Sequence, residues 1–496
     1  MTEDRSAADA GGGHAHHLVS CDYSAMELTG EHEGALADLQ RLQERCRGGL
    51  EAGLAVIAPD LRHGACRHLA AGLDGSCIFE LRGRQLITHG LLGFIASGET
   101  CLEIRSQFGG GRSGGDYLLC YMLERTGGLS LPDDPVPGVD FTPSERPAAL
   151  MALSFAHQLR AAMRRGLPRR YRLRRCNDLR LRGRLDVSRQ LQLNLPFTGR
   201  CACTAWEYDA DHEGTQLVAQ ALERLWRQRA AAGLLEQLCA DPELRSAVCR
   251  LRRAAPSAPR RRPAEPWRCA LRGVSGALYH PWHALQVMAA MILRGRSADF
   301  TAPGRHESCG LLLPGSWMWE AYLEQVLAGL GFTHGRPQCR ESGLEVYAAA
   351  AGTDGPAGTM VFPDFYISDR VVVDAKYKRR GPRSMLPGAA QAAGSSHGCL
   401  TGDDRSQIVA YMHLMGLGRG GHGALIYPRA VPAAAGSGHR GGAGRLRHEY
   451  GELSGWGGTL HYVGVPIPRA DSYAAFRQAM AQAEAELRAL IAGWLA

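Results

Sequence analysis

The stretch Val371-Val-Val-Asp374-Ala-Lys376-Tyr-Lys378 contains both lysines of the chain. The sequence has 57 lysine and arginine residues, so every basic side chain outside this stretch, apart from the histidines, is an arginine. A guanidinium group is always protonated and forked, whereas an ammonium group is a compact charge whose pKa shifts on burial. A lysine two residues after an aspartate in a valine-rich run therefore indicates a role that arginine cannot fill. For Lys378, chance retention at a solvated strand end is an equally open interpretation.

Three apolar runs around this stretch, bounded by turn residues, predict a β-meander over residues 344–350, 359–367 and 371–377. A turn centred on Asp369 would place Asp364 opposite Asp374, with Cβ atoms roughly 4.5–5.5 Å apart. Lys376 points to the same face as Asp374, because strand side chains alternate. The sequence thus predicts two carboxylates and one ammonium group at one place.

Two facing carboxylates repel each other, which raises the pKa of one of them unless a cation lies nearby. Mg²⁺ and Mn²⁺ prefer oxygen ligands and commonly use one or two carboxylates with water and substrate phosphate. We therefore expect Asp364 and Asp374 to bind Mg²⁺ (or Mn²⁺). Lys376 would orient or deprotonate an attacking water, or neutralise charge on a phosphate. A hairpin with Asp374 simply salt-bridged to Lys376 is the alternative.

A helix is expected over residues 316–327, with Ser316 as its N-cap. Glu320 shares a stripe of this helix with Leu323 and Leu327, where a carboxylate is out of place unless it meets a cation. The alternative is a surface glutamate favoured by the helix dipole.

A second helix is expected after the hairpin, with Asp404, Gln407 and Tyr411 on one of its faces. Their spacing would bring an amide and a phenol to the same side as the predicted carboxylates. Polar side chains that are satisfied locally in the core are the alternative interpretation for this face.

The order of these features resembles the PD-(D/E)xK nuclease superfamily. Pro363-Asp364, then Asp374-Ala-Lys376, then Gln407-x-x-x-Tyr411 is similar to the pattern of RecB-type nucleases. The resemblance implies a C-terminal restriction-endonuclease-like domain with a mixed sheet flanked by helices. The implied site consists of Asp364, Asp374, Glu320 and the Ala375 carbonyl around the metal, Lys376 on the attacking water, and Gln407 and Tyr411 as orienting groups.

The upstream segments resemble the McrC family, the nuclease subunit of McrBC-type and LlaJI-like restriction systems. The similar stretches are Gly90-Leu-Leu-Gly-Phe-Ile95, Leu102-Glu-Ile-Arg-Ser-Gln-Phe108, Asp116-Tyr-Leu-Leu-Cys-Tyr-Met-Leu123, Leu181-Arg-Gly-Arg-Leu-Asp186, Asn194-Leu-Pro-Phe197 and Trp319-Glu-Ala-Tyr322. Departures from the family pattern occur at Gln107 and over residues 207–213. The resemblance implies double-stranded DNA as substrate and a separately encoded, McrB-like AAA+ GTPase as partner.

Two other functions remain open on the sequence alone. One is a stand-alone DNA repair exonuclease of the RecB type, which would digest linear ends without a GTPase. The other is a regulatory subunit that stimulates a GTPase and does not cut DNA. No lysine lies where a Gly-x-x-x-x-Gly-Lys-Ser/Thr loop would need one, so we expect this chain alone to bind no nucleotide.

The domain organisation that we predict is of the mixed α/β class. A disordered tail over residues 1–30 precedes a β-rich N-terminal domain over 31–140, which would bind the partner. A helical, arginine-rich middle region spans 141–300, with a linker near 252–268. The nuclease domain occupies 301–496.

The composition also bears on the cellular compartment and on contacts with membranes and nucleic acids. The 15 cysteines suit a reducing cytoplasm and argue against a disulfide framework. No apolar run reaches the length of about 18 residues that a membrane span needs, and none resembles a secretory signal, so we expect no membrane association. An arginine cluster over residues 160–189 predicts contact with nucleic-acid phosphates. A second cluster, over 250–268, is more typical of a solvated linker.

Overall fold

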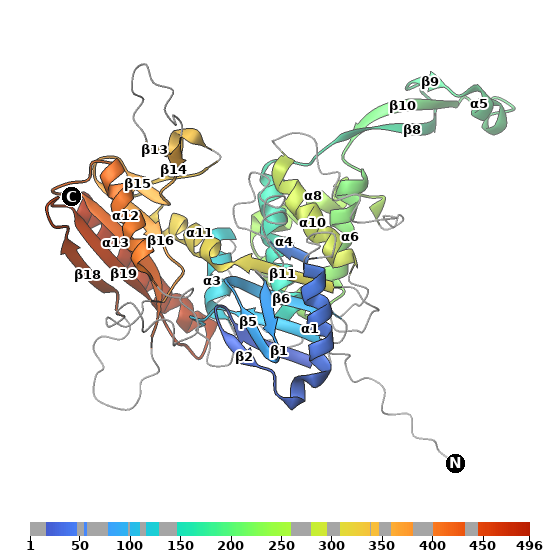
Figure 1. Cartoon of the computed structure of the whole chain (residues 1–496). Helices are drawn as coiled ribbons and strands as arrows, with labels where there is room; N and C mark the ends of the chain where they lie inside the picture. The colour runs from blue at the N-terminus through green and yellow to red at the C-terminus, as the bar shows by residue number, and fades with distance from the viewer. Residues whose placement is uncertain are drawn as a thin grey trace, which may run out of the picture.

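The computed structural model describes residues 16–46, 54–56, 78–97, 100–109, 116–127, 146–258, 279–294, 308–337, 339–346, 359–379, 400–431 and 445–496. Helices and strands are mixed along the whole chain, so the predicted α/β class is confirmed. Figure 1 shows an N-terminal sheet, a group of helices from which a long arm projects, and a C-terminal sheet on the other side.

The N-terminal sheet has five strands in the order β1-β7-β6-β11-β3. They are β1 (His16–Cys21), β3 (Leu54–Val56), β6 (Leu91–Ser97), β7 (Thr100–Arg105) and β11 (Ser308–Pro314). A smaller sheet consists of β2 (Ala25–Glu27), β4 (Phe79–Arg82) and β5 (Gln85–Thr88), with η1 (Gly30–His32) and α1 (Glu33–Cys46) beside it. The predicted tail is therefore wrong from residue 16 onward, because β1 pairs with β7 and buries Leu18.

β11 corrects the predicted boundary at residue 301. This strand comes from the C-terminal part of the sequence but pairs with β6 in the N-terminal sheet. Gly93 permits the pairing: its φ is +127°, and a Cβ there would lie 2.1 Å from the Leu311 carbonyl oxygen. The N-terminal and C-terminal parts thus share one continuous segment.

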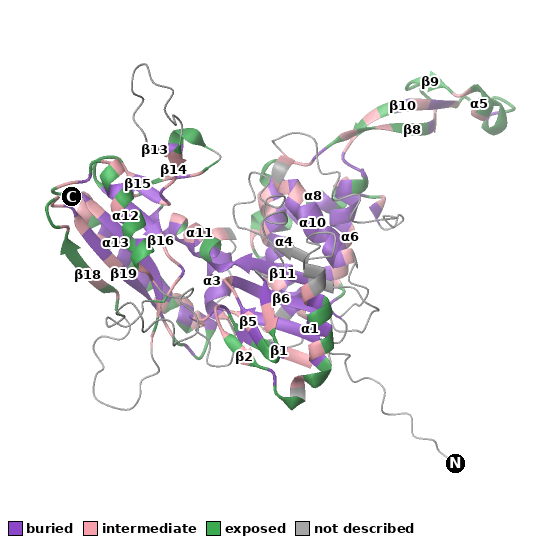
Figure 2. Cartoon of the chain, in the orientation of Figure 1, coloured by how far each residue is buried: buried purple, intermediate pink, exposed green. Residues whose placement is uncertain are grey.

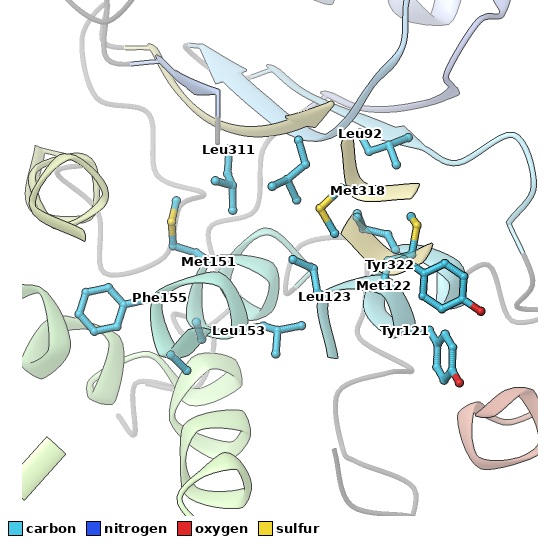
Figure 3. Packing of buried hydrophobic residues seen from close by; sticks show 14 of the residues in the cluster. Leu92, Tyr121, Met122, Leu123, Met151, Leu153, Phe155, Leu311, Met318 and Tyr322 are labelled. Carbon is cyan, nitrogen blue, oxygen red and sulfur yellow. The ribbon is translucent and has the colours of Figure 1, made fainter. Parts of the chain in front are cut away.

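The helical region packs against the N-terminal sheet. Its helices are α3 (Tyr117–Gly127), α4 (Arg146–Arg164), α6 (Glu213–Trp226), α7 (Arg229–Leu238), α8 (Pro242–Ala254) and α10 (His280–Arg294). Figure 3 shows side chains of α3 and α4 beside Leu92 and Leu311 of the sheet. Met318 and Tyr322, from the helix that directly follows β11, lie next to them. One apolar core therefore runs through these elements.

The arm was not predicted, because the middle region was expected to be helical. It consists of β8 (Arg170–Asp178), β9 (Arg184–Leu185), α5 (Val187–Leu193) and β10 (Cys201–Asp209), with the strand order β8-β10-β9. Figure 2 shows that most of it is exposed or half-buried. Its exposed large apolar side chains include Tyr171, Leu173, Leu191, Phe197, Trp206 and Tyr208.

The C-terminal sheet has six strands in the order β12-β15-β16-β17-β19-β18. They are β12 (Thr333–His334), β15 (Phe365–Ile367), β16 (Val371–Ala375), β17 (His422–Ala430), β18 (Arg447–Glu452) and β19 (Thr459–Ile467). The helices of this part are α11 (Gly315–Leu327), α12 (Gly402–Leu414) and α13 (Tyr473–Leu495), with the short η7 (Arg340–Ser342). β16, β17 and β19 run parallel and the other pairs are antiparallel, so the sheet is mixed.

The predicted meander is divided between two sheets. β13 (Leu344–Glu345) pairs only with β14 (Met360–Val361), in a separate two-stranded sheet, and residues 347–350 lie outside the described part. The chain then leaves extended pairing at Pro363, which has no N–H to donate to a neighbouring strand. β15 resumes the pairing beside β16.

Candidate active site

The hairpin of β15 and β16 has the register that the sequence predicted. Phe365 pairs with Val373 and Ile367 with Val371. Asp369 lies in the turn with a φ of +61°, a left-handed conformation that aspartate tolerates better than most residues. Continued by one residue, the register sets Asp364 opposite Asp374.

Asp374 is buried and Asp364 is half-buried, and the surroundings of both carboxyl groups disfavour their charged forms. Burial raises the pKa of Asp364 well above its usual value, and the nearby charges of Asp374 and Glu320 raise it further. Burial also raises the pKa of Asp374, against the lowering influence of Lys376. Two such groups at one place favour a bound cation over two bare negative charges.

Lys376 lies between the sheet and α12. Its ammonium nitrogen is 2.7 Å from Asp374 Oδ2 and donates a 2.7 Å hydrogen bond to Gln407 Oε1. Burial lowers the pKa of Lys376, but the carboxylates, Asp374 first, outweigh burial and raise it. The resting side chain is therefore a charged donor, and the salt bridge named as the alternative from sequence is present.

α12 carries Gln407 and Tyr411, the two residues for which the sequence predicted an orienting role. Gln407 Nε2 donates a 3.0 Å hydrogen bond to the Tyr411 hydroxyl, so Lys376, Gln407 and Tyr411 form one connected chain. The helix begins with a capping box in which Thr401 and Asp404 satisfy each other's backbone N–H groups. This cap fixes where the Gln407 side chain reaches the end of β16.

Glu320 has a partner that the sequence did not reveal. His334 Nε2 lies 2.6 Å from Glu320 Oε1, and His334 Nδ1 lies 3.4 Å from Glu324. Burial lowers the pKa of His334, but hydrogen bonds to the two glutamates outweigh burial and raise it to about 9. The expected N-cap is also wrong: α11 starts at Gly315 after Pro314, because β11 runs directly into the helix.

Lys378 is half-buried and has a partner on α12. Its ammonium group contacts both carboxylate oxygens of Asp404, at 2.9 and 3.1 Å. The capping pattern of Thr401 and Asp404 can be read from sequence, but the contact with Lys378 joins two segments that no local pattern connects.

The structure brings Asp364, Asp374, Lys376, Gln407 and Tyr411 together, and Glu320 lies near enough for its charge to raise the pKa of Asp364. The carboxylate oxygens of the half-buried Asp364 and the buried Asp374 are of the type that Mg²⁺ and Mn²⁺ prefer, so this pair of donors fits a hard cation. Over the described ranges, no group of three or more His, Cys, Asp or Glu side chains is arranged to hold a metal ion by itself. The arrangement thus suits an ion that keeps several waters or takes oxygens from a substrate.

A family profile described as "McrBC 5-methylcytosine restriction system component" matches residues 86–428. The chain belongs to this family. The match includes β6, α11, the β15–β16 hairpin and α12, and therefore all the candidate site residues. A search of curated proteins found no match.

Two solved structures from Thermococcus gammatolerans are similar to the chain. One is a refined half-complex from a tetradecameric assembly of McrB AAA+ hexamers with bound McrC, with a TM-score of 0.51 and 14% identity over 96% of this chain and 100% of that chain. The other is a McrBC complex, with a TM-score of 0.36 and 13% identity over 63% of this chain and 87% of that chain. At these identities the first supports the fold and the second carries no argument.

Within the described part of the chain, no helix combines the length and the apolarity needed to cross a bilayer.

Proposed function

We propose that the chain is the Mg²⁺-dependent (or Mn²⁺-dependent) DNA endonuclease subunit of a modification-dependent restriction system. The observation that carries the proposal is the convergence of Asp364, Asp374 and Lys376 in a member of the McrBC family. The reaction is hydrolysis of a phosphodiester bond in double-stranded DNA.

Each residue of the site has a role in this reaction that follows from its side-chain chemistry. Asp364 and Asp374 would hold the ion, with the Ala375 carbonyl and Glu320 as supporting groups. The bound ion would activate water and polarise the phosphate. Lys376 is charged at rest, so it suits stabilising the negative charge of the reacting phosphate better than taking a proton. Gln407 and Tyr411 would keep its ammonium group in place.

We propose a separately encoded AAA+ GTPase of the McrB type as the partner. A similar solved structure contains McrB AAA+ hexamers with bound McrC. Among the described residues, the arm presents large apolar side chains that a partner could cover: Leu173, Phe197 and Trp206 are each more than half exposed on it. A partner surface on the N-terminal sheet, expected from the sequence, stays a prediction.

The test uses the purified chain with its AAA+ partner, GTP, Mg²⁺ and DNA with or without 5-methylcytosine. We expect cleavage that Asp374→Asn abolishes, while stimulation of the GTPase by this variant stays at the wild-type level. Asp403→Asn is the matched control, because Asp403 is an exposed aspartate at the start of α12.

Each alternative predicts a different outcome. A stand-alone exonuclease would digest linear DNA without the partner or GTP. A regulatory subunit would stimulate GTP hydrolysis and never cut DNA. Cleavage by the Asp374→Asn protein would exclude the assigned site.

A further inference from the structure

The residue between the two lysines points away from the candidate site. Lys376 and Lys378 contact Gln407 and Asp404 on the side of α12. Tyr377 has the opposite direction, as strand alternation requires, and is only 3% exposed. The two lysines therefore face α12, whereas Tyr377 faces the opposite side of the same strand end.

Tyr377 lies against the N-terminal sheet. Its hydroxyl is 2.6 Å from Ser106 Oγ, in the turn that follows β7. Phe108 meets its ring edge-on, with centroids 5.2 Å apart. Gly315 leaves room on another side: a Cβ there would lie 2.6 Å from the Tyr377 ring. Gly315 is also the first residue of α11, the helix that carries Glu320.

The turn that receives Tyr377 is itself held firmly. Asp116 accepts a 2.6 Å hydrogen bond from the Ser106 N–H, and Asp22 accepts one from the Gln107 N–H. Arg379 donates a 3.0 Å hydrogen bond to the Gln107 carbonyl. The segment after β16 is thus bonded at two places to a turn that the buried Asp22 and the half-buried Asp116 hold in place beside the N-terminal sheet.

We propose that Tyr377 is a positioning residue, whose hydrogen bond with Ser106 sets the place of Lys376 relative to the carboxylate of Asp374. The inference rests on the nuclease function proposed above. A displacement of about 1 Å at a reacting group can lower a rate by roughly 100-fold. Holding the strand end in place would therefore keep the cleavage rate high. Because Ser106 lies in the turn directly after β7 of the N-terminal sheet, the geometry of the site depends on a part of the chain that contributes no reacting group.

The test compares Tyr377→Phe, Ser106→Ala and the double variant in the cleavage assay with partner, GTP and Mg²⁺. We expect each single variant to lower kcat by about 10-fold and to leave KM for DNA unchanged. The double variant should be no worse than Ser106→Ala, because both single variants remove the hydrogen bond between Ser106 and Tyr377. Ser106→Ala also removes the 3.1 Å hydrogen bond that Ser106 Oγ accepts from the Phe108 N–H, so Tyr377→Phe is the cleaner of the two single variants. Mn²⁺ affinity, measured by calorimetry without DNA, should stay at the wild-type value in all three.

Tyr473→Phe is the matched control. Tyr473 is a buried tyrosine whose hydroxyl donates a 2.6 Å hydrogen bond to Glu124, away from the site. This variant should lower Tm and leave kcat unchanged. Should Tyr377→Phe fail to fold, Ser106→Ala carries the test.

The outcomes separate this inference from the proposed function. Wild-type kcat in both single variants, or effects that add in the double variant, would overturn the positioning role while wild-type cleavage and its loss in Asp374→Asn still stand. A fall in Mn²⁺ affinity that parallels kcat would mean general loosening of the site and would also overturn it. A wild-type protein that neither cuts DNA nor binds Mn²⁺ would overturn both proposals.

Discussion

The backbone N–H of Ala375 donates a 2.6 Å hydrogen bond to Asp364 Oδ2. This bond favours the charged form of Asp364, whereas burial and the neighbouring Asp374 favour the neutral form. The carboxylate is therefore held in a fixed place by the strand that carries Asp374. A divalent ion would remove the conflict between the two groups.

We expect Mg²⁺ or Mn²⁺ to raise the Tm of the wild-type protein. An ion that binds only the folded state stabilises it by about 2.7 kcal/mol at a concentration of 100 times its Kd. Scanning calorimetry with and without the ion measures the shift. Asp364→Asn and Asp374→Asn should lose most of it, and Asp403→Asn should keep it. An equal shift in all four proteins would place the ion elsewhere.

The two lysines should respond differently to arginine. Lys376→Arg should lower kcat at least ~100-fold, because the longer fork cannot keep the 2.7 Å contacts with both Asp374 and Gln407. Lys378→Arg should lower it less than ~3-fold, because a guanidinium group suits the two oxygens of Asp404. The assay is single-turnover cleavage. Wild-type cutting by Lys376→Arg would show that no compact cation is needed.

Glu484 ties α13 to α3. It accepts hydrogen bonds from the Tyr121 hydroxyl at 2.7 Å and from Arg125 at 2.8 Å. Glu484→Ala should destabilise the protein by about 1.5–3 kcal/mol, the typical loss when hydrogen bonds to a buried charged group are removed. The midpoint of urea unfolding measures the change. Gln478→Ala, at an exposed position of the same helix, should have no effect, and an equal loss in both variants would contradict this role of Glu484.

Three histidines should make the C-terminal sheet sensitive to acid. His461 on β19 is hydrogen-bonded at 2.9 Å to His422 on β17 and at 2.9 Å to His448 on β18. Trp494 of α13 stacks on His461, with ring centroids 4.2 Å apart. Burial, with repulsion from the two neighbouring histidines, lowers the pKa of His461 from 6.5 to about 3.

The direction of the pH effect follows from this pKa. The unfolded chain takes up a proton at His461 as the pH falls below 6.5, and the folded protein does not until about pH 3. Stability is therefore complete above pH 6.5 and falls on acidification, by up to about 1.4 kcal/mol per pH unit for one proton. Between pH 7 and 5 the urea midpoint of His461→Gln should change less than that of the wild type. His413→Gln, on the exposed side of α12, should behave as the wild type, and identical pH profiles for all three proteins would refute the assignment.

Much of the hairpin could be predicted because its information is local. Alternation in the valine-rich run, with turn residues on both sides, predicted the register that places Asp364 opposite Asp374. Residue types then predicted a hard-cation site, and the helical spacing of Gln407 and Tyr411 brought their side chains together. The bounds of the strands were less predictable: the strand expected over residues 359–367 is interrupted at Pro363, between β14 and β15.

The groups that converge at the site could be predicted from the sequence, because side-chain periodicity and turn chemistry act over a few residues. Their surroundings come from long-range packing. Pairing of β11 with β6, the contact of His334 with Glu320, and the hydrogen bond between Ser106 and Tyr377 each join segments far apart in the chain or in separate elements. Such contacts depend on how whole sheets and helices pack, and this packing leaves no periodic signal in the sequence around any one residue.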